Sequence, residues 1–116
     1  MGSTKTDGGD CGSGAITSPG LVLVDFWAPW CDVCQATSLL AEDLAERYTG
    51  RLRAIRVDVD KEPVLAARYQ VQAVPTLALL VNGELVDQFV GFAPRDKVRE
   101  AIERLLQRQE EQARQA

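Results

Sequence analysis

A short apolar segment followed at once by two closely spaced cysteines is the feature that most restricts the fold. Residues 21–26 read Leu-Val-Leu-Val-Asp-Phe, and residues 27–34 read Trp-Ala-Pro-Trp-Cys-Asp-Val-Cys. A continuous apolar run of this length is typical of a central strand that is covered on both faces. A helical pattern begins at Cys31, so both thiols are predicted at a junction between strand and helix. Such a dithiol can close into a reversible disulfide, and the start of a helix favours a thiolate.

The remaining pattern predicts one α/β domain. The expected elements are a strand at 21–27, a helix from 31 to about 50, a strand at 52–59, a helix at 62–70, strands at 76–81 and 84–90, and a helix from 94. A right-handed crossover would make the first two strands parallel, and a tight Asn82-Gly83 turn would make the last two antiparallel. We therefore expect a mixed four-stranded sheet that is flanked by helices on both faces.

Hydrophobic spacing also predicts the core and the boundaries of the domain. The helix after the cysteines is expected to bury Ala36, Leu40, Leu44 and Tyr48, which recur every four residues. The expected core consists of Val22, Val24, Phe26, Leu40, Leu44, Ile55, Val57, Leu77, Leu79, Phe89, Val98 and Ile102. Residues 1–20 are rich in Gly, Ser, Thr and Asp and are interpreted as a flexible tail. The domain is expected at 21–106, followed by a polar helical extension at 107–116.

Composition narrows the class of function. The formal net charge of −4 carries no basic signature for nucleic acid or an anionic membrane, so neither is expected as a partner. The first ten residues contain no apolar segment of the kind found in secretory signals. Three cysteines, two of them in the Cys-x-x-Cys pair, fit a cytosolic redox motif better than a disulfide-stapled secreted scaffold. We therefore expect a cytoplasmic protein.

Several motifs in a fixed order resemble the thioredoxin family. They are Val24-Asp25-Phe26-Trp27, Trp30-Cys31-Asp32-Val33-Cys34, Val57-Asp58-Val59-Asp60, Val74-Pro75-Thr76, Asn82-Gly83 and Gly91. The resemblance runs from about residue 21 to 106 and implies the thioredoxin fold. The first strand and helix that are common in longer thioredoxins have no counterpart in residues 1–20, so we expect them to be missing.

The resemblance implies roles for three residues. Cys31 would be the attacking thiol and Cys34 the resolving thiol. A static disulfide or half of a zinc site is the alternative, but a chain without histidine or a second Cys-x-x-Cys pair lacks ligands for a mononuclear zinc site. Asp25 would be a buried acid with a raised pKa that accepts the proton of Cys34. Its alternative role is a structural carboxylate that pairs with a cation, for which Arg56 is well placed.

The resemblance also implies a substrate surface. A cis peptide bond before Pro75 would place the backbone of Val74 beside Cys31, where it could pair with an extended substrate segment. An ordinary trans proline at the start of a strand is the alternative. Trp30 is expected as a surface aromatic residue, and Gly91 belongs to a loop that completes the surface. Phe92 could join this loop or could pack in the core.

Two departures from the family pattern affect the dithiol. Asp32-Val33 replaces the usual Gly-Pro between the cysteines, and Gln35 replaces the lysine that usually follows. An added carboxylate and a lost cation both disfavour a thiolate, so the pKa of Cys31 should be lowered less than in other members.

The primary functional hypothesis is a protein-disulfide oxidoreductase that cycles between dithiol and disulfide. A thioredoxin reductase would regenerate the dithiol, no cofactor would bind to this chain, and the protein would be a monomer. The alternative is a protein-docking or co-chaperone module with little redox activity, which the unusual Asp32-Val33 pair motivates. An oxidant or isomerase in an oxidising compartment is a third hypothesis.

Overall fold

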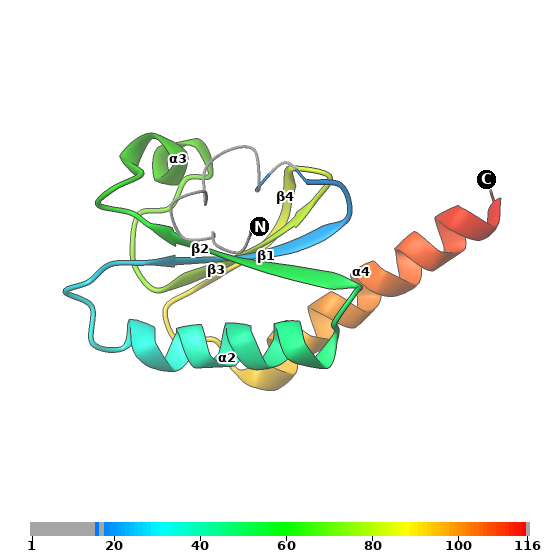
Figure 1. Ribbon diagram of the computed structural model, residues 1–116, viewed down its shortest axis with the longest axis horizontal. Coiled ribbons are helices and arrows are strands. Elements are labelled where there is room, and N and C mark those ends of the chain that lie inside the picture. Colours follow the sequence, from blue (N-terminus) through cyan, green and yellow to red (C-terminus); the bar gives the residue numbers. More distant parts are fainter. Residues whose placement is uncertain (1–15, 17, 116) are drawn as a thin grey trace.

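The computed structural model describes residue 16 and residues 18–115, and a four-stranded mixed sheet forms its centre (Figure 1). The strands are β1 (Leu21–Trp27), β2 (Leu52–Asp58), β3 (Thr76–Val81) and β4 (Glu84–Val90). Their order across the sheet is β2-β1-β3-β4. Strands β1 and β2 are parallel, whereas β3 runs antiparallel to both β1 and β4. The predicted mixed sheet and its strand directions are confirmed.

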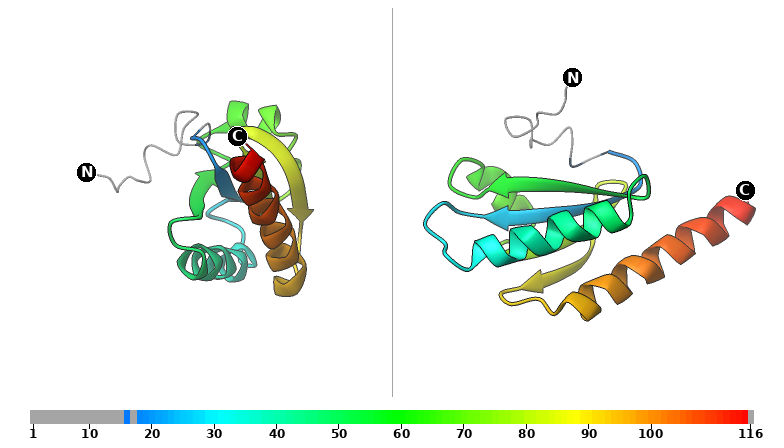
Figure 2. Two further views of the ribbon diagram at one scale, coloured as in Figure 1. Left: turned by 90° about the vertical axis from the view of Figure 1, so that its right-hand side faces the viewer. Right: turned by 60° about the horizontal axis from the view of Figure 1, so that its bottom comes forward.

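Helices cover both faces of this sheet, as predicted. Helices α2 (Cys34–Arg47) and α4 (Arg95–Gln115) lie on one face, and α3 (Pro63–Arg68) lies on the other (Figures 1 and 2). Side chains of β1 point alternately to the two faces. Leu21 and Leu23 join the apolar cluster beneath α2 and α4, whereas Val22, Val24 and Phe26 join the cluster beneath α3. Strand β1 is therefore buried on both sides.

The core agrees closely with the predicted set. All of the predicted residues are buried except Leu40 and Phe89, which are partly buried and pack against the cluster on the α2 face. The Asn82-Gly83 hairpin is confirmed, and both residues have positive φ angles, of 52° and 86°. Such angles are those of the tight turn that suits the twist of a two-stranded ribbon.

The start and the buried face of α2 differ from the prediction. The helix begins at Cys34 rather than Cys31, and Ala36 is exposed. The residues that α2 buries are Cys34, Thr37, Ser38, Ala41 and Leu44. Residues four apart drift by about 40° around a helix of 3.6 residues per turn, so a row based on that spacing alone leaves the true face. Thr37 and Ser38 conceal this face in the sequence because both are polar.

The packed structure also begins earlier than predicted. Ile16 is fully buried in the cluster on the α3 face. The hydroxyl of Ser18 accepts a hydrogen bond from Arg53, and the backbone N–H of Gly20 donates to the side chain of Asn82. A boundary at residue 20 is therefore too late, because one large apolar side chain anchors a segment whose average composition is polar. Residues 1–15 and 17, on which the other expectations for this segment fall, lie outside the described residues.

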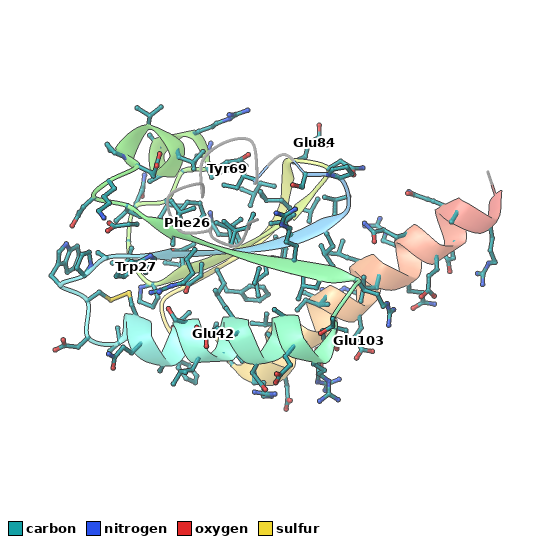
Figure 3. The ribbon with its side chains drawn as sticks, viewed as in Figure 1. Phe26, Trp27, Glu42, Tyr69, Glu84 and Glu103 are labelled. Carbon is teal, nitrogen blue, oxygen red and sulfur yellow. A yellow bond between two sulfur atoms is a disulfide. The ribbon has the colours of Figure 1, made fainter. Side chains whose placement is uncertain are left out.

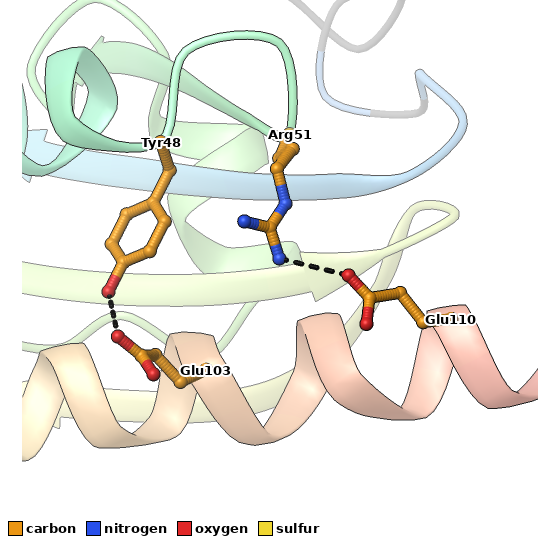
Figure 4. Close-up of polar contacts among 4 residues, drawn as sticks. All are labelled: Tyr48, Arg51, Glu103 and Glu110. Atoms are coloured by element: carbon orange, nitrogen blue, oxygen red, sulfur yellow. Dashed lines mark hydrogen bonds and ion pairs between the residues drawn. The ribbon is translucent and has the colours of Figure 1, made fainter.

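Helix α4 continues beyond residue 106 and contacts the segment that follows α2 (Figure 4). The Tyr48 hydroxyl donates a hydrogen bond of 2.6 Å to Glu103 Oε2. The guanidinium of Arg51 lies 3.2 Å from Glu110 Oε2, and both of these side chains are more than half exposed. An exposed ion pair contributes only about 0–1 kcal/mol, so the contact of Glu110 adds little to the stability of the fold.

Candidate active site

The predicted site residues gather at one end of the sheet. Within β1, Trp27 pairs with Asp58 at the end of β2, and Phe26 pairs with Thr76 at the start of β3. Thr76 in turn pairs with Val90 at the end of β4. Strand pairing therefore brings the segment after β1, the segment before β3 and the segment after β4 to the same edge. These segments hold every predicted site residue except Asp25, which lies two positions before the end of β1.

Cys31 and Cys34 form a disulfide across the turn that leads into α2 (Figure 3). Their Cα atoms are 5.4 Å apart. The N–H of Cys31 donates to the carbonyl of Ala28 at 3.1 Å, and the N–H of Cys34 donates to the carbonyl of Cys31 at 3.3 Å. Cys31 is partly exposed, whereas Cys34 is 2% exposed. An external disulfide can therefore reach Cys31 far more easily than Cys34.

Asp25 is a buried carboxylate on the face of β1 that α2 covers. It is 1% exposed. Its Oδ2 atom accepts a hydrogen bond of 2.6 Å from the Ser38 hydroxyl and lies 3.5 Å from Arg56 Nε. Its Oδ1 atom is buried and has no hydrogen-bond partner among the described residues. Burial raises the pKa of Asp25, the contacts with Ser38 and Arg56 oppose this increase, and Glu42 adds to it.

Arg56 is held on two sides. It is the register partner of Asp25 on β2, and its guanidinium carbon lies 4.2 Å from the centre of the Trp27 ring. The Arg56 side chain remains 48% exposed. Each of the two roles considered for Asp25 has an observation in its favour. The nearby Arg56 fits a structural carboxylate paired with a cation, and the raised pKa fits an acid that accepts a proton.

A cleft of about 590 Å³ connects the dithiol to this network. It is lined by Trp27, Ala28, Pro29, Cys31, Asp32, Cys34, Gln35, Ser38, Leu39, Glu42 and Arg56. Both cysteines and both partners of the Asp25 carboxylate thus border one open space.

Replacing Asp25 with Asn is expected to change how stability depends on pH. The raised pKa means that the folded chain keeps a proton that the unfolded chain loses near its ordinary pKa of 3.8. The free energy of unfolding should therefore fall as pH rises from that value through the folded pKa, and then stay lower. Urea denaturation of the oxidised protein between about pH 4 and pH 8 should show this decline in the wild type and not in Asp25→Asn. Glu84→Gln, on the exposed start of β4, is the control; an equal decline in wild type and Asp25→Asn would contradict the prediction.

The expected substrate residues are placed as follows. Trp30 is 68% exposed, and its Nε1–H donates to Asp60 Oδ2 at 2.9 Å. The Val74–Pro75 peptide bond is cis, as the resemblance implies. The N–H of Gly91 donates to the carbonyl of Pro75 at 2.8 Å, which joins these two loops.

The sequence allows Phe92 either a core or a surface position, and the structure decides between them. It is 88% exposed. Phe92 is therefore a surface residue next to Gly91.

Sequence reasoning missed two contacts at this site. Ser38 gives no signal, because a serine within a helix is most often a solvent-facing residue. Asp60 is part of a matching motif without an assigned role, and its contact with Trp30 links segments 30 residues apart. A buried carboxylate needs a partner, so Asp25 itself could have prompted a search for a donor on the facing helix.

Two further findings concern the described residues only. Within residue 16 and residues 18–115, no group of three or more His, Cys, Asp or Glu side chains is placed to hold a metal ion. None of the helices in the same residues combines the length and the apolar character needed to cross a bilayer.

Comparisons with a family model, with related sequences and with a solved structure all identify thioredoxins. The thioredoxin family model matches residues 14–104. A thioredoxin of Staphylococcus saprophyticus is 42% identical over 87 residues, which cover 75% of this chain and 84% of the relative. A thioredoxin of Bacillus subtilis is 39% identical over 92 residues, covering 79% of this chain and 88% of the relative. Among solved structures, a mutant thioredoxin from Halobacterium salinarum is 35% identical with a TM-score of 0.73, covering 81% of each chain.

Proposed function

This chain belongs to the thioredoxin family, and from that premise we propose that Cys31 is its attacking thiol, Cys34 its resolving thiol and Asp25 the acid that receives a proton. The protein is a thiol-disulfide oxidoreductase. The observation that carries the assignment of roles is the unequal exposure of two bonded cysteines. Cys31 is partly exposed, whereas Cys34 is buried on the helix that covers Asp25.

The reduction proceeds in two exchanges. The Cys31 thiolate attacks one sulfur of a substrate disulfide, forms a mixed disulfide and releases the other sulfur as a thiolate, which takes up a proton. Cys34 then loses its proton to the Asp25 carboxylate. The resulting Cys34 thiolate attacks the sulfur of Cys31, and the second substrate sulfur leaves as a thiolate. Two electrons pass from the dithiol to the substrate, and the protein is left with the Cys31–Cys34 disulfide.

Substrates would lie along the edge where the three segments meet. The exposed ring of Trp30 and the loop at Gly91 border this edge. The backbone N–H and C=O groups of Val74, just before Pro75, would pair with an extended segment of the substrate, as an added strand does. This arrangement supports protein disulfides, rather than small-molecule disulfides, as the main substrates.

Partners, location and domain limits complete the proposal. A thioredoxin reductase would restore the dithiol, and the protein would act as a monomer in the cytoplasm, where a reducing environment keeps thiols available. The functional domain would extend from about residue 16 to 106, because Ile16 is buried in the core and the family match begins at residue 14. Residues 107–116 would form a polar extension of α4.

The test is reduction of insulin disulfides with two electron sources. With dithiothreitol, and separately with NADPH and a bacterial thioredoxin reductase, the protein should accelerate the precipitation of insulin chains. Failure with both sources, together with prevention of aggregation of an unfolded client protein, would favour the docking or co-chaperone alternative. Failure with the reductase alone would overturn only the proposed partner.

The two thiols of the reduced protein should differ in reactivity. Alkylation with iodoacetamide across pH should modify Cys31 before Cys34, because Cys31 is partly exposed and Cys34 is buried. Replacing Asp32 with Gly removes a carboxylate next to Cys31 and should lower the pH at which Cys31 reacts. Mass spectrometry of a Cys11→Ser protein would identify the modified site. Earlier alkylation of Cys34 would reverse the assigned roles, and a shift to higher pH in Asp32→Gly would contradict the expected effect of its carboxylate on Cys31.

A further inference from the structure

Ser38 is a buried hydroxyl that contacts the acid of the site. It lies in the second turn of α2 and is 7% exposed. Its Oγ donates a hydrogen bond of 2.6 Å to Asp25 Oδ2, across the interface between α2 and β1. Its neighbour Thr37 is 8% exposed and makes no hydrogen bond to Asp25 in the part of the chain that the structure describes. Of these two buried hydroxyl groups, only that of Ser38 contacts Asp25.

The two oxygens of Asp25 differ sharply in their surroundings. Oδ2 faces the Ser38 hydroxyl and the Nε–H group of Arg56, 3.5 Å away. Oδ1 is buried without a partner among the described residues. An oxygen that already faces two donors is a poor place for another proton, because donors stabilise its negative charge. The incoming proton should therefore bind Oδ1.

We propose that Ser38 is a positioning residue for disulfide exchange, holding Asp25 by Oδ2 so that Oδ1 is the atom that accepts the proton of Cys34. The proposal rests on the proposed role of Asp25. In the exchange the S–H bond of Cys34 breaks and an O–H bond forms at Oδ1. The electron pair left on Cys34 forms the bond to the Cys31 sulfur, and the substrate sulfur leaves with the pair of the broken S–S bond. The Ser38 proton stays on its own oxygen throughout.

The charged groups around Asp25 set the direction of the expected effect. Arg56 faces it from β2, and Glu42 faces it from α2. On β3 the register partner of Asp25 is the apolar residue Leu77. Burial and Glu42 raise the pKa of Asp25, and Ser38 and Arg56 lower it. Without the Ser38 hydroxyl, Arg56 would be the only one of these groups that lowers it. The Asp25 carboxylate would then hold its proton to higher pH, and fewer molecules would be able to deprotonate Cys34 at a given pH.

The experiment follows the second exchange separately from the first. Reduced protein with Cys11→Ser is mixed with dithiobis(nitrobenzoate), and two molecules of thionitrobenzoate are released in turn, first by Cys31 and then by Cys34. The second rate does not depend on the reagent concentration and reports attack by Cys34. In Ser38→Ala its pH profile should move up by about one pH unit, which is about a tenfold loss of rate on the acid limb.

Matched variants separate positioning from general damage to the helix. Ser38→Thr keeps a hydroxyl and should restore the wild-type profile, whereas Thr37→Ala removes a neighbouring buried hydroxyl and should leave the profile unchanged. The carboxyl carbon signal of Asp25 in the oxidised protein should also titrate at higher pH in Ser38→Ala. An unchanged profile and an unchanged titration in Ser38→Ala would overturn the proposal.

The variant Asp25→Asn distinguishes this failure from failure of the proposed function. Asp25→Asn should abolish the acid limb of the pH profile for the second release of thionitrobenzoate, the limb that Ser38→Ala is expected to shift. A wild-type limb in Asp25→Asn would show that Asp25 is not the proton acceptor, and both proposals would fail. A lost limb in Asp25→Asn with no shift in Ser38→Ala would overturn the role of Ser38 alone.

Discussion

Replacing Cys31 with Ser should reduce insulin reduction to the rate of dithiothreitol alone. A serine hydroxyl cannot form the mixed disulfide, and Cys34, the other thiol of the pair, is 2% exposed. No other described group at this edge of the sheet can take over, because exchange requires a sulfur nucleophile. The measurement is the turbidity of precipitating insulin chains at equal protein concentrations.

Two other cysteine variants provide the controls. Cys34→Ser keeps the attacking thiol, so it should lose turnover but accumulate a covalent complex with a disulfide substrate. A non-reducing gel would show this complex. Cys11→Ser removes the third cysteine of the chain and should retain full activity. Wild-type turnover in Cys31→Ser would contradict the assigned chemistry.

Replacing Leu79 with Ala should cost about 2–5 kcal/mol of unfolding free energy. Leu79 is fully buried on the central strand β3, in the cluster beneath α2 and α4. Truncation removes buried apolar surface and leaves a cavity that a sheet with neighbours on both sides cannot close. For a domain with a typical total stability of about 5–15 kcal/mol, this is a large fraction. Urea denaturation should show a lower midpoint with an unchanged slope.

Leu39→Ala makes the same chemical change on the surface of α2. Leu39 is 65% exposed, so its replacement should alter the free energy of unfolding by no more than about 0.5 kcal/mol. Equal effects of the two replacements would contradict the observed packing. The two variants therefore compare the same Leu→Ala replacement at a buried and at an exposed position.

The fold was predictable where the local pattern had one interpretation. The apolar run of β1 predicts a central strand, the helical crossover to β2 predicts that these two strands are parallel, and the Asn82-Gly83 turn predicts that β3 and β4 are antiparallel. The face of α2 was less predictable, because Thr37 and Ser38 are buried polar residues within a helix. Ile16 was missed because a single apolar residue in a polar segment gives no periodic signal.

The candidate site was predictable to the level of residue type and position. Asp25 stands out because it interrupts an apolar strand, and both cysteines stand out by spacing. The contacts between elements were not predictable, because the hydrogen bond from Ser38 to Asp25 depends on how α2 rotates over β1. That rotation is set by packing of the whole buried face of α2 against the sheet.

The direction of α4 has a practical consequence for attachment of the protein. The turn that bears the Cys31–Cys34 disulfide and the last turn of α4 lie at opposite ends of the longest axis (Figures 1 and 3). A linker or affinity label joined beyond Gln115 would therefore extend away from the redox centre. Immobilising the protein on a bead or an electrode through this end should leave the dithiol directed toward the solution.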